Sequence, residues 1–154
     1  MRLALYQPDI PQNAGTLMRM AACFGLPVDI IEPTGFDASD RNLRRAGLDY
    51  LQHLDLTRHV SFAAFDAARR AAGSLLVLAT THAATPCWDV AFRPGDTLLL
   101  GRETAGVPDE VHRAADIRLL VPMRPGLRSL NVAVAAAIVT GEMMRQARDW
   151  PAGA

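Results

Sequence analysis

Short apolar runs alternate along this chain with longer stretches in which apolar residues recur every three or four positions. The short runs predict buried β-strands, and the longer stretches predict amphipathic helices between them. Strands are expected at Arg2–Tyr6, Val28–Ile31, Tyr50–Thr57, Leu75–Thr80, Thr97–Gly101 and Ile117–Val121. Helices are expected at Ala14–Phe24, Asp37–Leu48, Ala63–Ala72, Pro108–Ala115 and Asn131–Arg148. This alternation predicts an α/β fold with a mainly parallel sheet and helices on both faces.

Some residues near the predicted element ends have a specific expected role. Asn13 is the expected N-cap of the first helix, and Gly25 is its expected C-cap. Gly73 is expected to end the helix at Ala63–Ala72. Trp88 lies in an irregular stretch and is expected to pack against the core.

Length and composition fit one domain. The chain has 154 residues, half of them hydrophobic, so a sizeable core can form. We expect the domain to span residues 1–148 and to leave a loose tail at 149–154. The 16 basic and 16 acidic side chains cancel, so a polyanion would have to bind at a local patch. All the basic residues are arginine, which suits bidentate phosphate contacts, although GC-rich coding also explains this bias.

Other classes of protein are excluded by what the sequence lacks. Cys23 and Cys87 lie far apart and no C-x-x-C occurs, so neither a zinc site nor a disulfide framework is indicated. We therefore expect no bound metal. No apolar run is long enough to span a membrane, and the first residues do not resemble a signal peptide. A cytoplasmic location without membrane association is expected.

Two loops that follow predicted buried strands are rich in glycine and polar groups, and such loops bind ligands in α/β proteins. The first, Gly101–Pro108, reads GRETAGVP, in which Gly101 and Gly106 allow a tight turn and close approach of a ligand. No Lys-Ser/Thr pair follows, and no G-x-G-x-x-G follows the first strand, so the common nucleotide motifs are absent. Glu103 is explained equally well as an exposed carboxylate or as a functional group.

The second loop, Pro122–Asn131, reads PMRPGLRSLN and is too long for a simple turn. Ser129 and Asn131 are good helix-capping residues, which is sufficient to explain them. Alternatively, this loop wraps a small polar ligand with its backbone groups. Arg124 and Arg128 would then face a partner that carries phosphate.

The remaining arginines also have two interpretations. Arg19 lies near the amino end of its predicted helix, where the helix dipole disfavours a cation. Such a violation of a local rule is typical of a functional site, although a surface arginine lying along the helix would also explain it. Arg41, Arg44 and Arg45 share one helix face, either as solvated charges or as phosphate ligands.

Three motifs, each just after a predicted strand, together resemble those of the SPOUT superfamily of RNA methyltransferases. They are N-x-G-x-x-x-R from Asn13 to Arg19, GRETAGVP at Gly101–Pro108, and the PM and SLN ends of Pro122–Asn131. The runs IIEPTGF and LRRAGLDY, which begin at Ile30 and Leu43, are similar to one subfamily. Its members are small bacterial enzymes that methylate the ribose of the tRNA wobble nucleotide. The likeness covers essentially the whole chain.

This resemblance implies a homodimer in which each protomer has a deep trefoil knot in its carboxyl-terminal half. It implies that S-adenosyl-L-methionine binds in the knot, that S-adenosyl-L-homocysteine is the product, and that no metal takes part. The residues expected to contact the cofactor are Ala79, Thr80, Gly101, Glu103, Gly106, Val121, Met123, Ser129 and Leu130.

The implied reaction is 2′-O-methylation of the cytidine or modified uridine at the wobble position of a tRNA anticodon stem-loop. Arg19 is expected to bind the ribose hydroxyl, reaching across the dimer. The other residues expected in catalysis are Asn13, Glu103, Ser129 and Asn131. The residues expected to contact RNA phosphates are Arg41, Arg44, Arg45, Arg124 and Arg128.

Two alternative functions stay open on the sequence. A related enzyme of the same superfamily would methylate another site in tRNA or rRNA, although the LRRAGLDY run favours the anticodon stem-loop. A flavodoxin-like binding module without catalysis would explain the α/β pattern and the two loops. It would not explain why the polar residues of all three motifs occur together. Binding of S-adenosylmethionine would distinguish the module from the enzymes.

Overall fold

The computed structural model describes residues 1–36 and 53–148. The predicted helix Asp37–Leu48, with Arg41, Arg44 and Arg45, lies outside the described residues, and so does the expected tail at 149–154. Within the described ranges, no helix combines the length and the apolar composition that a membrane span needs.

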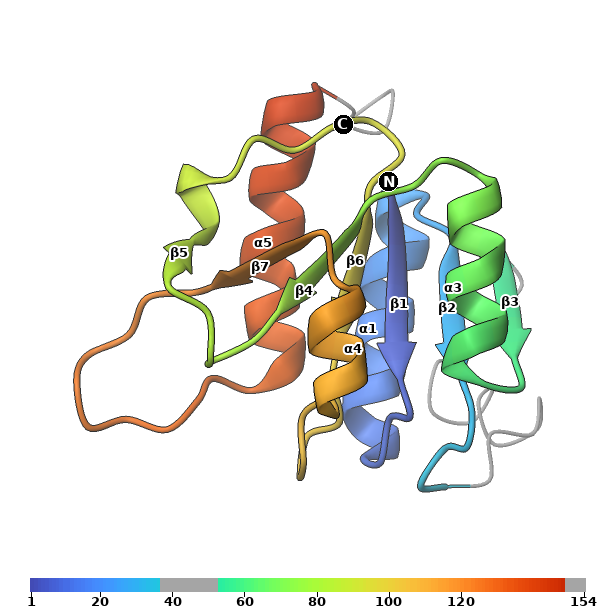
Figure 1. Ribbon diagram of the computed structural model, residues 1–154, viewed down its shortest axis with the longest axis horizontal. Coiled ribbons are helices and arrows are strands. Elements are labelled where there is room, and N and C mark those ends of the chain that lie inside the picture. The colour runs from blue at the N-terminus through green and yellow to red at the C-terminus, as the bar shows by residue number, and fades with distance from the viewer. Residues whose placement is uncertain (37–52, 149–154) are drawn as a thin grey trace.

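Parallel strands form the centre of the described part of the molecule (Figure 1). They are β1 (Arg2–Tyr6), β2 (Val28–Ile31), β3 (Leu56–His59), β4 (Leu76–Ala79), β5 (Thr85–Pro86), β6 (Thr97–Leu100) and β7 (Ile117–Leu120). Together they form one seven-stranded sheet in the order β3-β2-β1-β6-β4-β7-β5, and every pairing is parallel. The predicted parallel α/β fold is confirmed. Because β6, β4 and β7 are neighbouring parallel strands, the loops at their carboxyl ends lie at the same edge of the sheet.

Helices cover both faces of this sheet. α1 (Pro11–Phe24) and α5 (Val132–Ala147) pack on one face, and α3 (Phe62–Ala71) and α4 (Asp109–Ala114) pack on the other (Figure 1). Successive residues of β1 contribute to different cores, because Leu3 and Leu5 pack with the first pair while Ala4 packs with the second. Strands buried on both faces are continuously apolar, as the sequence pattern shows.

The first helix begins at Pro11 rather than at Ala14, and Ile10 is its N-cap without a side-chain hydrogen bond. Proline is favoured in the first turn because the N–H that it lacks would have no helical partner there. The prediction that Asn13 caps this helix is therefore wrong, whereas Gly25, with a φ of 67°, is confirmed as the C-cap. Arg19 lies near the middle of α1, so its predicted conflict with the helix dipole does not exist.

The third strand, β3, begins at Leu56, so residues 53–55 of the predicted strand Tyr50–Thr57 are not part of it, and it includes Arg58 and His59, which were expected to follow the strand. The reason is the buried carboxylate of Asp29 on β2, which needs polar partners. Its oxygens lie 2.8 Å from Nε of Arg2 and 2.8 Å from Nε2 of His59. Hydrophobic periodicity does not detect a strand whose inward contact is polar.

The prediction that Trp88 packs against the core is wrong. Trp88 belongs to a short 3-10 helix, η2 (Cys87–Asp89), and 56% of its surface is exposed, while the smaller Cys87 is buried. Gln146 of α5 accepts a hydrogen bond from the Phe92 N–H at 3.0 Å. Because a small side chain and a backbone contact already fix this segment, the indole ring is left at the surface.

Arg69 of α3 is a buried arginine that ties several element ends together. Its guanidinium donates to Asp66 and Asp116, both at 2.7 Å, and to the carbonyl oxygen of Ala114 at the end of α4. Asp116 also accepts the Leu76 N–H at 2.8 Å, at the start of β4. This cluster therefore fixes β4 and α4 relative to α3.

Candidate functional site

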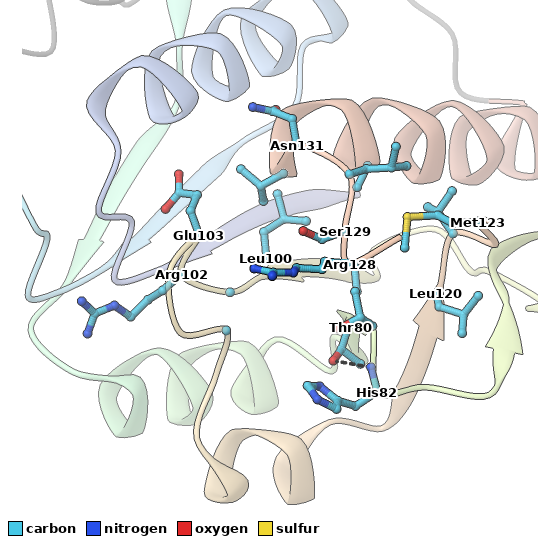
Figure 2. Close-up of a pocket in the computed structure, with 18 of the residues that line it drawn as sticks. Thr80, His82, Leu100, Arg102, Glu103, Leu120, Met123, Arg128, Ser129 and Asn131 are labelled. Atoms are coloured by element: carbon cyan, nitrogen blue, oxygen red, sulfur yellow. Dashed lines mark hydrogen bonds between the residues drawn. The ribbon is translucent and has the colours of Figure 1, made fainter. Parts of the chain in front are cut away.

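A cavity of about 980 Å³ lies at the carboxyl ends of β4, β6 and β7. Its walls are the loop after β4, the 101–107 loop after β6 and the 121–131 loop that leads into α5 (Figure 2). Apolar side chains that line it include Leu78, Leu100 and Leu120. A cavity of this size, with apolar walls and a few polar groups, is typical of ligand sites in α/β proteins.

The structure brings nearly all the described predicted site residues to this one cavity. Every residue expected at the cofactor lines it, namely Ala79, Thr80, Gly101, Glu103, Gly106, Val121, Met123, Ser129 and Leu130. Asn13, Asn131, Arg124 and Arg128 line it as well. Arg19 is the exception, because it lies on an exposed face of α1 and does not line the cavity of its own protomer.

The loop after β6 is a tight turn that requires glycine. Reciprocal backbone hydrogen bonds of 3.0 and 2.9 Å join Arg102 and Gly106, and Gly106 has a φ of 65°. A Cβ on Gly101 would lie 2.9 Å from the carbonyl carbon of Gly106, closer than real side chains approach. The turn therefore presents bare backbone to the cavity, as the spacing of the two glycines predicts.

Glu103 is a held carboxylate rather than a freely solvated one. Its Oε2 accepts the Asp9 N–H at 3.1 Å, and its own N–H donates to Oδ1 of Asp9 at 3.1 Å. Burial raises the pKa of Glu103, and its hydrogen bond with the Asp9 carboxylate raises this pKa further. Glu103 is therefore half-buried and fixed by hydrogen bonds, in contrast to an exposed loop carboxylate.

Asn131 caps a helix, as its residue type predicts, and it also makes a second side-chain contact. As the N-cap of α5, its Oδ1 accepts the N–H groups of Ala133 at 2.8 Å and Val134 at 3.4 Å. Its Nδ2 donates to Oδ1 of Asn13 at 2.9 Å, and so connects α5 to α1. Ser129 is not a cap, and it lies exposed at the cavity.

The long loop before α5 carries two arginines that the sequence predicts to contact phosphate. Arg124 and Arg128 are both exposed, and both line the cavity. Figure 2 shows Arg128 and Ser129 at the same cavity as Glu103 and Met123. Arg41, Arg44 and Arg45, expected in the same role, are outside the described residues.

Sequence reasoning missed three polar residues at or beside the site. His82 and His112 line the cavity, and their rings meet edge to face with centroids 6.0 Å apart. Asp9 lies in the loop between β1 and α1, for which the sequence predicted no site residue. Its signal was available, because Asp9 follows a buried strand at the edge of the sheet where the other site residues lie. In the described residues, no three His, Cys, Asp or Glu residues are grouped to hold a metal ion.

Comparison with known proteins identifies the family. The model of the SpoU rRNA methylase family matches residues 1–141 of this chain. The chain belongs to the SpoU rRNA methylase family. This result confirms the resemblance to RNA methyltransferases that the three motifs indicate.

Relatives of this SpoU methylase include tRNA methyltransferases of similar length. The tRNA (cytidine(34)-2'-O)-methyltransferase of Beijerinckia indica is 60% identical over 144 residues, which are 94% of this chain and 90% of the relative. The protein of the same name from Escherichia coli is 38% identical over 149 residues, covering 95% and 93% of the two chains.

Solved structures of SpoU methylases share this fold. One, described as structural insights into the 2-OH methylation of C/U34 on tRNA, has a TM-score of 0.88 at 44% identity and covers 94% of both chains. Another is the SpoU methyltransferase AviRb of Streptomyces viridochromogenes in complex with AdoMet. It has a TM-score of 0.82 at 29% identity and covers 95% of this chain and 57% of that one.

Proposed function

We propose that this protein is an S-adenosylmethionine-dependent methyltransferase that modifies the ribose 2′-oxygen of the tRNA wobble nucleotide. The observation that carries the proposal is that each of the three separated motifs contributes residues to one cavity at the carboxyl edge of the sheet. The high identity to tRNA (cytidine(34)-2'-O)-methyltransferases over nearly the whole chain supports the choice of substrate.

The cavity suits the cofactor. Its apolar walls, which include Leu100 and Leu130, fit an adenine ring, and the bare backbone at Gly101 allows a ligand to approach closely. When bound, S-adenosylmethionine supplies an activated methyl group with a thioether as the leaving group. The protein therefore needs to position the acceptor oxygen in line with that methyl group and to remove the proton of the hydroxyl.

The polar end of the cavity would position the ribose. Asn13, Glu103 and Asn131 are held there by hydrogen bonds, and Ser129 lies close to them in the same cavity. Arg19 would orient the hydroxyl and bind the adjacent phosphate. A guanidinium, with a pKa above about 12, is poorly suited to act as the base, so the proton would leave to that phosphate or to water.

The position of Arg19 supports a homodimer as part of this proposal. Arg19 does not line the cavity of its own protomer, so it would act in the cavity of a second copy. α5 lines the cavity at its amino end and exposes 49% of Val134 and 41% of Ile138 further along. A second copy packed on α1 and α5 would cover these apolar side chains and bring its own Arg19 to the cavity.

The knot expected of the superfamily is also part of this proposal. β7 lies between β4 and β5 inside the sheet, and α5 then crosses to the opposite face from α4. We propose that the 121–131 loop closes the knot around the cofactor. A protein that modifies tRNA would work in the cytoplasm.

The experiment is methylation of unmodified tRNA by the purified protein with S-adenosylmethionine, followed by mass spectrometry of the nucleosides at each position. We expect one added methyl group on the ribose at the wobble position. A methyl group elsewhere in tRNA, or only in rRNA, would identify a different target for the same chemistry. Failure to bind S-adenosylmethionine in calorimetry would support the binding module instead.

A further inference from the structure

Asp9 lies beside the cavity, and most of its hydrogen-bonding capacity is used on the loop after β6. Only 10% of its side chain is exposed. Oδ1 accepts the Glu103 N–H at 3.1 Å, and Oδ2 accepts the Thr104 hydroxyl and lies 3.5 Å from Nε of Arg102. The Asp9 N–H in turn donates to the Glu103 carboxylate. Three consecutive residues of the turn are therefore held by one aspartate.

We propose that Asp9 is a positioning residue for methyl transfer, which fixes Glu103 and the loop after β6 against the start of α1. The inference rests on the proposed function. It assigns to Asp9 a role that acts through Glu103 rather than through contact with the reacting atoms.

The surroundings of Asp9 are built to keep it in place. The N–H of Gly35, in the loop after β2, donates to the carbonyl oxygen of Pro8 at 2.9 Å. A Cβ on Gly35 would lie 2.7 Å from Cβ of Asp9 and 2.8 Å from its Cα, so only glycine fits against this residue. Two loops, after β2 and after β6, thus enclose Asp9 from different directions.

Asp9 also connects the turn to the helix that carries Arg19. The next residue, Ile10, is the N-cap of α1, and its carbonyl oxygen accepts the Asn13 N–H at 3.1 Å. Asn13 accepts the hydrogen bond from Asn131. A displaced Asp9 would therefore move Glu103 relative to Asn13, and it would disturb both the cofactor side and the ribose side of the site.

A carboxylate is required at this position because both of its oxygens accept hydrogen bonds. The hydrogen bond from Glu103, together with the Thr104 hydroxyl and the Arg102 guanidinium, holds the pKa of Asp9 well below its ordinary value. Burial and the neighbouring Asp9 carboxylate raise the pKa of Glu103 above its ordinary value. Arg102 is the other charged group that faces the pair. Removing the charge of Asp9 lowers the pKa of Glu103 toward its ordinary value.

The test compares Asp9→Asn with the wild type and with Asp89→Asn, a control at an exposed residue of η2. We expect Asp9→Asn to lower kcat roughly tenfold to a hundredfold, because a misplacement of about 1 Å costs this much, while the KM for tRNA changes little. The part of the pH–rate profile that reports Glu103 should shift to lower pH. A crystal structure should show Glu103 turned away from residue 9.

Thr104→Val removes one hydroxyl donor from the same cluster and is a milder second variant. It should change kcat in the same direction by a smaller factor, and it keeps the inference testable if Asp9→Asn does not fold. Calorimetry with S-adenosylhomocysteine measures binding apart from turnover, and we expect affinity to fall less than kcat. An Asp9→Asn enzyme with wild-type kcat, pH profile and Glu103 position would overturn the inference. A wild-type protein that methylates no RNA would instead refute the proposed function.

Discussion

At the scale of single residues, Asn131 shows how one side chain combines a structural and a functional contact. Its oxygen caps α5, and its nitrogen reaches Asn13 on α1. Serine or aspartate would cap the helix equally well, but neither has an amide nitrogen to donate. The amide therefore has a use beyond the cap, and substitutions can separate the two contacts.

We predict that Asn131→Ala lowers the free energy of unfolding by about 1 kcal/mol because the cap is lost. Asn131→Asp keeps the acceptor and places a negative charge at the helix N-terminus, so its stability should stay near that of the wild type. Both variants lose the donor to Asn13, and both should transfer methyl groups slowly. Urea denaturation and single-turnover rates measure the two effects. An Asn131→Asp enzyme of normal rate would show that the donor is not needed.

At the scale of elements, α3 carries two adjacent arginines that bind the same Asp66 in different surroundings. The Arg69 side chain is 4% exposed and also binds Asp116, whereas the Arg70 side chain is 58% exposed and binds only Asp66 among the residues described. Buried and exposed ion pairs differ in their effect on stability, because a buried charge left without its partner stays desolvated.

We therefore predict that Arg69→Met lowers the free energy of unfolding by about 3 kcal/mol, since it removes a buried partner of two carboxylates. The matched variant Arg70→Met should lower it by less than about 1 kcal/mol. Chemical denaturation of both variants provides the comparison. Equal effects would mean that Arg69 does not join α3 to β4 and α4 as its contacts indicate.

The loop between β7 and α5 is the element expected to bind RNA phosphates. We predict that changing Arg124 and Arg128 together to Ala weakens tRNA binding and makes it less sensitive to salt. The plot of the logarithm of the binding constant against the logarithm of the salt concentration should become shallower by about 1.5. Filter binding over a range of salt concentrations measures this slope. Arg70→Ala, an exposed arginine that does not line the cavity, is the control and should leave the slope unchanged. An unchanged slope in the double variant would make these arginines solvated charges only.

At the scale of the whole molecule, the proposed dimer can be tested by combining two inactive variants, because each site would take residues from both protomers. Arg19→Ala should abolish methyl transfer and retain binding of S-adenosylhomocysteine. Gly101→Val should distort the turn that forms one wall of the cofactor site, because its Cβ would lie 2.9 Å from the carbonyl carbon of Gly106. If Arg19 acts across the dimer, refolding the two inactive variants together should restore about a quarter of wild-type activity to the whole mixture, because about half of the dimers are mixed and each mixed dimer has one intact site.

The same mixture also tests the alternatives. No recovery in dimers shown by native mass spectrometry to be mixed would place Arg19 in the site of its own protomer. A monomeric wild-type protein would contradict the dimer directly. Near-normal turnover by Arg19→Ala alone would remove Arg19 from the mechanism.

Much of this molecule was predictable because strongly apolar runs allow few alternatives. The central strands and the helix ends at Gly25 and Asn131 follow from local chemistry. Two features could not be predicted from local chemistry. The edge strand that contains His59 depends on the buried carboxylate of Asp29, and the segment around the exposed Trp88 depends on Gln146, which is far away in the sequence. The motifs predicted most of the described polar residues that line the cavity, whereas Asp9 belongs to none of the motifs.

The amino-acid sequence by itself determined the α/β class, the family and the glycine turns, since these depend on periodicity and on residues close together in the chain. Only the tertiary structure decided which polar side chains hydrogen-bond to each other. The Asp9–Glu103 and Asn13–Asn131 contacts join residues 94 and 118 positions apart. Such pairs are set by the order of the strands, because neighbouring strands bring distant loops to one edge of the sheet.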